Sequence, residues 1–142
     1  MAFIKPHTER IYAILRIVAG LMFMQHGLQK LFGLFGGMPP GAPAFVTYGA
    51  GTIELVGGAL IALGLFAAPA AFVASGLMAF AFFLGHVAPT GKIIPVENQG
   101  ELAALYCFLF LFVAAKGAGV WSLDSVRERS RPDGGIGKLA PG

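Results

Sequence analysis

The sequence predicts an all-α integral membrane protein, an antiparallel four-helix bundle with both termini cytoplasmic. Three observations support this fold class. The chain is 56% hydrophobic with a mean hydropathy of +0.75, and only 12% of its residues are charged. Its apolar residues gather in four long stretches, which are separated by shorter segments that contain Gly and Pro. Its lysines and arginines concentrate near the two ends of the chain, as expected for cytoplasmic termini.

The four apolar stretches predict helices over about 11–35, 45–66, 70–87 and 101–116. A helix needs about 20 apolar residues to cross the 30 Å hydrocarbon core of a bilayer. The first two stretches are long enough alone, whereas the last two need flanking residues. A soluble all-α bundle is the alternative, but no stretch has a clean polar face of the amphipathic kind. We therefore expect a transmembrane domain over 1–123 and a polar cytoplasmic tail over 124–142.

The basic residues also predict the orientation and the compartment. All lysines and arginines except Lys30 and Lys92 fall on the side of the bundle that holds both termini. The positive-inside rule places that side in the cytoplasm, for a multi-pass protein of the cell inner (plasma) membrane. The tail is expected to form a short helix beside the membrane, followed by disorder. Its Arg127, Arg129 and Arg131 either contact anionic lipid or are simply solvated.

The pI near 9.3 raises the question of nucleic-acid binding. We expect no nucleic-acid partner, because the basic residues lie at the predicted membrane edges and the sequence contains no readout module. The expected surroundings are the lipid bilayer and other membrane-protein subunits. Small residues at helical spacing, such as Gly58 and Ala62, favour close helix–helix contacts of the kind that membrane proteins use.

Ionisable residues inside the apolar stretches are the strongest indication of a functional site. A charge at membrane depth costs about 2.5–3.5 kcal/mol on insertion scales, so such residues usually face a bundle interior and pair with one another. His26, Gln29 and Lys30 share one face of the first predicted helix at spacings of three and four. Glu54 lies at a similar depth in the second predicted helix. We therefore predict that Lys30 and Glu54 form an ion pair.

Three further polar residues belong to the outer half of the predicted bundle. His86 closes the third predicted helix, whereas Asn98 and Glu101 lie where the fourth begins. The sequence thus predicts one ligand-binding pocket lined by His26, Gln29, Lys30, Glu54, His86, Asn98 and Glu101. The alternative is that these polar groups only hold the helices together. Catalytic residues are not assigned.

A quinone headgroup, or another small aromatic molecule, suits such a pocket. It needs donors to two carbonyl oxygens, a proton source and apolar walls. In this hypothesis His26 and Lys30 hold the oxygens. Glu54 carries the proton, and His86 connects the pocket to water. Metal binding is a weaker alternative, because the sequence has no HxxxH or CxxC spacing.

No intrinsic cofactor is expected, although quinone is a candidate ligand. The chain has one cysteine, Cys107, so it cannot supply the thiolates of an iron–sulfur cluster. It shows no nucleotide-binding fingerprint and no haem-ligand pair of evident spacing. An oxidoreductase of this kind would take its electrons from a partner subunit.

Three segments of the sequence are similar to motifs of the DoxX family of small membrane proteins. The stretch HGLQKLFGLFGG, from His26 to Gly37, resembles the family's first-helix signature. The stretch GTIELVGGALIALGL, from Gly51 to Leu65, resembles its second-helix motif with the acidic residue. AFFLGHVAPTG, followed by 97–124, is similar to its third-to-fourth helix region. One departure is Gln99, where the family often has a small residue after Asn98.

The resemblance covers about 11–124 and implies a four-helix membrane bundle. It also implies an association with thiosulfate:quinone oxidoreductase and with membrane oxidoreductase complexes linked to oxidative stress. Distant relatives in the wider superfamily act as membrane chaperones or cargo receptors. The expected function is therefore a quinone-linked subunit of a larger membrane complex. A non-enzymatic assembly subunit or chaperone is the first alternative, and a small transporter is the second.

Overall fold

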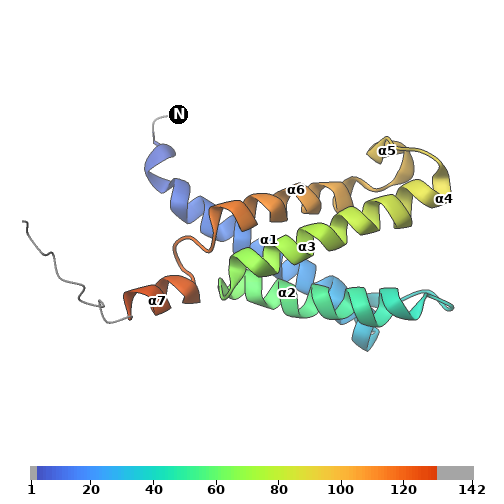
Figure 1. Ribbon diagram of the computed structural model, residues 1–142, viewed down its shortest axis with the longest axis horizontal. Helices are drawn as coiled ribbons and strands as arrows, with labels where there is room; N and C mark the ends of the chain where they lie inside the picture. Colours follow the sequence, from blue (N-terminus) through green and yellow to red (C-terminus); the bar gives the residue numbers. More distant parts are fainter. Residues whose placement is uncertain (1–2, 131–142) are drawn as a thin grey trace, which may run out of the picture.

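The computed structural model describes residues 3–130, and its regular elements over that part of the chain are all helices (Figure 1). The main elements are α1 (Thr8–Phe32), η3 (Phe45–Ala50), α2 (Gly51–Leu63), α3 (Ala67–Phe80), η4 (Ala81–Val87), α4 (Ala88–Thr90), α5 (Pro95–Asn98), α6 (Glu101–Lys116) and α7 (Leu123–Arg129). Short 3-10 turns at Lys5–His7 and Leu34–Gly36 flank α1. The all-α prediction is confirmed. The predicted disorder after the tail helix, and Arg131, lie outside the described residues.

Three continuous helical segments among the described residues are long and apolar enough to cross a membrane: Lys5–Phe32, Phe45–Leu63 and Ala67–Thr90. The second segment joins η3 to α2, and the third joins α3, η4 and α4. The remaining long helix, α6, has 16 residues and is about 24 Å long at 1.5 Å per residue. Since the hydrocarbon core is about 30 Å thick, a fourth crossing by α6 stays a prediction.

Glycines in the left-handed conformation end two of the long helices earlier than the apolar pattern predicts. α1 ends at Phe32 because Gly33 has φ +69°, and its N–H donates to the carbonyl of Gln29. α2 ends at Leu63 because Gly64 has φ +64°. A glycine takes this conformation without the steric cost that a Cβ imposes, so it closes a helix efficiently.

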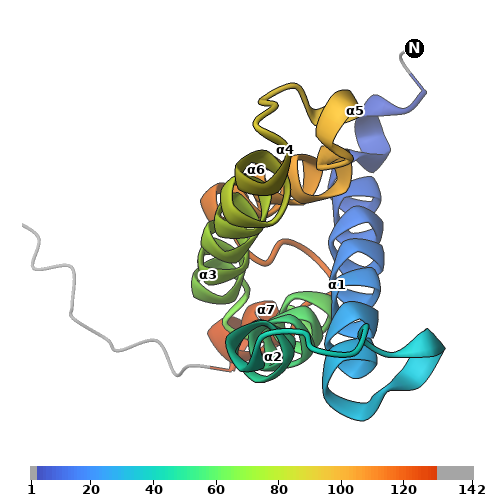
Figure 2. The same ribbon diagram turned by 90° about the vertical axis from the view of Figure 1, so that its right-hand side faces the viewer.

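The helices pack as two pairs, α1 with α2 and α3 with α6, which the short turn after Leu63 connects (Figures 1 and 2). Both views show that α2 and α3 separate with distance from that turn. The start of α1 and α7 lie at the same end of the molecule, which we call the terminal end (Figure 1). The segment 88–100 lies at the other end, which we call the loop end.

Glycines let α1 and α2 approach until their backbones touch. A Cβ added to Gly20 would lie 2.7 Å from the carbonyl oxygen of Gly58, and one added to Gly58 would lie 2.7 Å from that of Gly20. Gly27 makes the same kind of contact, because its Cβ would lie 2.7 Å from the carbonyl oxygen of Gly51. Helix association in lipid depends on such close packing, because lipid tails are as apolar as the side chains.

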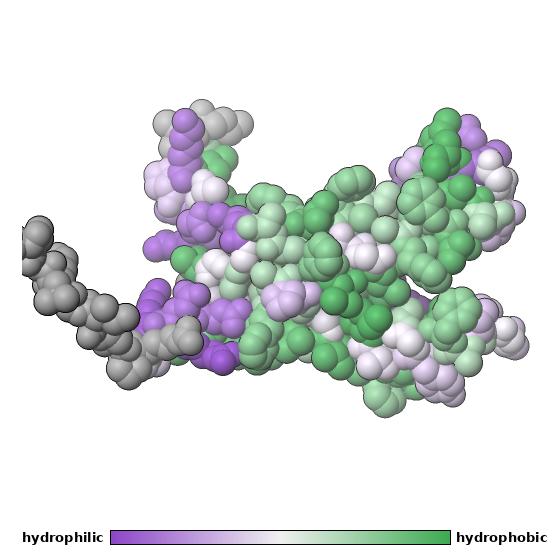
Figure 3. Space-filling view, viewed as in Figure 1, coloured by the Kyte–Doolittle hydropathy of each residue, from purple (hydrophilic) through white to green (hydrophobic). Residues whose placement is uncertain are grey.

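The interior combines small residues with a cluster of aromatic rings. Phe23 from α1 and Phe110 from α6 are almost fully buried, and their ring centroids lie 4.8 Å apart in an edge-to-face contact. Tyr106 stacks on Phe110 at 5.2 Å. Large apolar side chains such as Phe72 and Phe108 are instead exposed on the outside of the bundle. This distribution matches a bundle whose outer surface contacts lipid. The hydrophilic residues gather mainly at the terminal end in Figure 3.

Candidate functional site

A pocket of about 650 Å³ lies where α2 and α3 separate toward the loop end. The hollow is visible in Figure 3 on that side of the molecule. Most of its lining is apolar, and the lining consists of Lys30, Pro43, Phe45, Val46, Gly49, Ala50, Ile53, Glu54, Val73, Leu77, Met78, Phe80, Ala81, Leu84, Gly85 and His86. A mainly apolar cavity with a few convergent polar groups is the usual form of a small-molecule site.

Both π-helical segments of the described chain contribute to this pocket. η3 supplies four lining residues, from Phe45 to Ala50, and η4 supplies four more, from Ala81 to His86. The wider turn of a π-helix changes the direction of the side chains that follow it, and such segments occur often at functional sites. Two of them facing each other here support the interpretation of the pocket as a site rather than a packing gap.

The ion pair between Lys30 and Glu54 supplies two of the few polar side chains that line the pocket. The Nζ of Lys30 donates to both carboxylate oxygens of Glu54. The Glu54 side chain is only 3% exposed and that of Lys30 is 16% exposed, so both charges are largely buried. Gly51, one turn before Glu54, makes room for the lysine, since a Cβ there would lie 3.0 Å from Lys30 Cβ. The predicted pairing is present in the structure.

His86 reaches the pocket from η4 and is tied to the loop end by Asn98. The carbonyl oxygen of Asn98 lies 3.1 Å from His86 Nδ1, and a carbonyl can only accept, so Nδ1 carries the proton. That tautomer leaves Nε2 as an acceptor when the ring is neutral. The buried Asn98 amide donates to the Lys92 carbonyl at 2.8 Å and accepts from the Gly100 N–H at 2.7 Å. Asn98 therefore orders the loop and positions His86, but does not itself line the pocket.

Besides Asn98, three more of the residues predicted for the pocket are not among those that line it. His26 lies one turn before Lys30 on the same face of α1. Gln29 donates to the Phe35 carbonyl at 3.5 Å, in the loop after α1. Glu101 is exposed at the start of α6. The structure thus brings Lys30, Glu54 and His86 together, with His26 beside them.

The terminal end contains a second polar network that the site prediction left out. Arg16 is fully buried, and its guanidinium donates to the carbonyls of Ile61, Ala62 and Trp121, the last two at 2.8 Å. It therefore satisfies carbonyls at the end of α2, where a cation also complements the helix dipole. The charge of Arg16 within an apolar stretch was visible in the sequence, but its partners lie more than 40 residues away.

Asp124 from α7 completes this network. Its carboxylate accepts from the backbone N–H groups of Phe66 and Ala67 at 3.0 and 3.1 Å. These are the unpaired amides at the start of α3, where an acceptor and a negative charge both stabilise a helix. The chain after α6 thus fastens the turn between α2 and α3.

No group of three or more His, Cys, Asp or Glu side chains able to hold a metal occurs within residues 3–130.

Comparison with known proteins gives a consistent family assignment. The DoxX family model matches residues 11–87. An uncharacterized protein of Haemophilus influenzae is 44% identical over 128 residues, which is 86% of this chain and 94% of that protein. A Bacillus subtilis protein named "Putative oxidoreductase CatD" is 27% identical over 129 residues, or 87% of this chain and 91% of that protein. No solved structure gives a significant match. Together with the three long apolar helices, these matches show that the chain is a multi-pass membrane protein that belongs to the DoxX family.

Proposed function

We propose that this protein is a quinone-linked subunit of a membrane oxidoreductase, and that the pocket between α2 and α3 receives the quinone headgroup. The observation that carries the proposal is the convergence of Lys30, Glu54 and His86, from three helices, on one largely apolar pocket. A headgroup with two carbonyl oxygens needs donors in an otherwise apolar cavity. The name of the Bacillus subtilis relative is consistent with redox chemistry.

The roles of the three residues follow from their donors and acceptors. Lys30 donates to one oxygen of the headgroup without losing contact with Glu54, since an ammonium has three N–H donors. Glu54 exchanges protons with that oxygen through the lysine. His86, whose Nε2 accepts when neutral and donates when protonated, serves the second oxygen. Reduction of a quinone also takes two electrons, and we propose that a partner subunit with its own redox centre supplies them.

Quinone binding can be tested directly on the purified protein. Organic extracts of the wild-type protein are expected to contain quinone, and titration with decylubiquinone in detergent is expected to saturate. His86→Ala should weaken binding about tenfold, because it removes a hydrogen bond worth roughly 1 kcal/mol together with packing area. His7→Ala is the matched control, since His7 is exposed before α1 at the terminal end. Wild-type protein that neither carries nor binds quinone would exclude the oxidoreductase hypothesis.

A non-enzymatic assembly role is the second candidate, and the ion pair itself favours it. Lys30 and Glu54 already satisfy each other, and they lie directly beside the Gly27–Gly51 contact between α1 and α2. In this case the polar groups hold the helices in register for a partner protein. Both candidates place the chain in a larger complex. Purification in mild detergent with a mass measurement would identify partners, and an active monomer would contradict the subunit role.

A further inference from the structure

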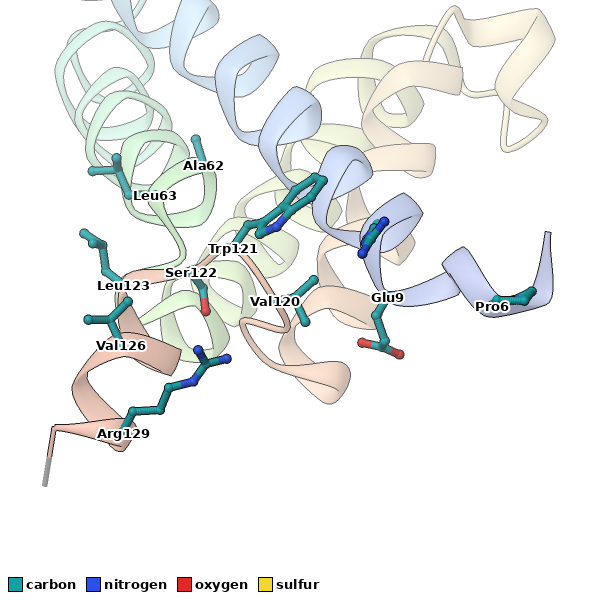
Figure 4. A pocket seen from close by; sticks show the side chains of 11 residues that line it. Pro6, Glu9, Ala62, Leu63, Val120, Trp121, Ser122, Leu123, Val126 and Arg129 are labelled. Carbon is teal, nitrogen blue, oxygen red and sulfur yellow. The ribbon is translucent and has the colours of Figure 1, made fainter. Parts of the chain in front are cut away.

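A second pocket, of about 720 Å³, lies at the terminal end of the molecule (Figure 4). It lies among the start of α1, the end of α2, the loop before α7 and α7 itself. None of the residues that line the quinone pocket takes part in it. The pocket lies at the start of one membrane-length helix, Lys5–Phe32, and at the end of another, Phe45–Leu63. Lipid headgroups contact a membrane protein at this level.

The charged side chains of this pocket leave a net positive charge. Arg10 and Arg129 line it, and within residues 3–130 neither arginine forms an ion pair. Glu9 also lines it, but its carboxylate is bound to the Nζ of Lys116 at 2.8 Å. Figure 4 shows the Arg129 side chain turning from α7 back toward the loop that holds Ser122. Two arginines that form no ion pair with another described residue therefore line one side of the pocket.

The other side of the same pocket is apolar and exposed. Leu63, Trp121 and Val126 line it, and each is more than half exposed, at 55%, 58% and 57%. Tryptophan is enriched at the boundary between headgroups and acyl chains. Leu123 and Val126 lie three residues apart on one face of α7, as in a helix that rests on a membrane surface. The pocket thus offers cations to a phosphate and apolar side chains to the acyl chains attached to it.

We propose that this pocket binds an anionic phospholipid, with Arg10 and Arg129 on the headgroup phosphate and the acyl chains along Leu63, Trp121 and Val126. A zwitterionic lipid gains less from the two arginines, because it carries a cation of its own. Each arginine close to an anionic lipid surface contributes about a fivefold preference. The inference does not depend on the quinone proposal, because the two pockets share no residue and lie at opposite ends.

The chain contains a built-in probe for this test. Trp121 is the only tryptophan in the sequence, and it lines the pocket. The full-length protein is placed in vesicles that are mainly phosphatidylcholine, with a small fraction of lipid brominated on its upper acyl carbons. Brominated phosphatidylglycerol is expected to quench the Trp121 fluorescence more strongly than brominated phosphatidylcholine at the same mole fraction. Equal quenching by the two lipids in the wild-type protein overturns the proposal.

Two variants distinguish lipid binding in this pocket from nonspecific attraction of anionic lipid to the basic surface. In the double variant Arg10→Gln/Arg129→Gln the two lipids are expected to quench equally. Arg127→Gln is the matched control, because Arg127 lies on the same helix but is placed 4.9 Å over the Phe66 ring, outside this pocket. It should keep most of the lipid preference. A loss in Arg127→Gln as large as that in the double variant would mean diffuse attraction, and it would overturn the assignment of a site.

Discussion

At the scale of single residues, burial decides how much an ion pair contributes to the stability of the fold. The Lys30–Glu54 pair is almost entirely removed from solvent, whereas the Lys92–Glu97 pair is 3.6 Å apart with side chains 56% and 47% exposed. Removing one partner of a buried pair leaves an uncompensated charge, which costs about 3–5 kcal/mol. An exposed pair contributes about 0–1 kcal/mol, because water screens it and the side chains lose entropy. The two pairs therefore provide a test and its control in one chain.

We predict that Lys30→Met and Glu54→Gln each lower the free energy of unfolding by about 3–5 kcal/mol, and that the double variant loses much less than their sum. Thermal unfolding in detergent measures this coupling. The corresponding cycle on Lys92 and Glu97 should show coupling below about 1 kcal/mol. Additive effects at Lys30 and Glu54 would contradict an interaction between them.

At the scale of elements, the contact between α1 and α2 depends on the absence of side chains at particular glycines. A Cβ at Gly58 would lie 2.7 Å from the Gly20 carbonyl oxygen and 2.9 Å from Met24 Cα. A Cβ at the adjacent Gly57 would meet no heavy atom within 4 Å. The two glycines share the same helix and nearly the same depth, so their substitution separates packing from helix propensity.

Gly58→Ala is therefore expected to force the two helices apart and to cost about 1–3 kcal/mol of stability, the usual cost of overpacking. Gly57→Ala should be neutral or stabilising by about 0.5–1 kcal/mol, because alanine favours a helix interior over glycine. Comparison of the two melting temperatures in the same detergent checks this. Equal destabilisation by both substitutions would show that α1 and α2 are not in backbone contact.

At the scale of the whole molecule, the terminal end and the loop end differ in chemistry. The terminal end holds Arg16 and Asp124 in a network that joins α1, α2, α3 and α7, and it holds most of the basic residues. The loop end holds the open pocket and His86. This asymmetry supports the proposed orientation, in which the terminal end faces the cytoplasm.

The orientation leads to a topology prediction. Reporter proteins fused at either terminus should give cytoplasmic signals, because the positive-inside rule keeps the basic terminal end on that side. A reporter inserted in the segment 88–100 should give a signal from the opposite side of the membrane. A periplasmic signal from either terminus would contradict this topology, and signals from opposite sides for the two termini would also contradict the fourth crossing by α6.

The sequence by itself determined which segments form the long helices. It also determined that Lys30 requires a partner of opposite charge at its own depth, which Glu54 supplies. Hydropathy is a property of contiguous residues, and the cost of a charge in lipid is large enough to require a partner at the same depth. It also determined the family, because the motifs that carry it are local. The ends of the helices also depend on single glycines such as Gly33, which takes the left-handed conformation. A hydropathy pattern does not predict that conformation.

Only the tertiary structure decided how the two ends of the bundle are built. Asp124 starts α3 at Ala67 through hydrogen bonds across 58 and 57 residues of sequence, and such partners leave no local signal. The divergence of α2 and α3 opened a pocket that includes His86 but not Gln29 or Glu101, although all three belong to the outer half in sequence. Helical spacing predicts which residues share a face, but the direction of that face depends on which helices pack together.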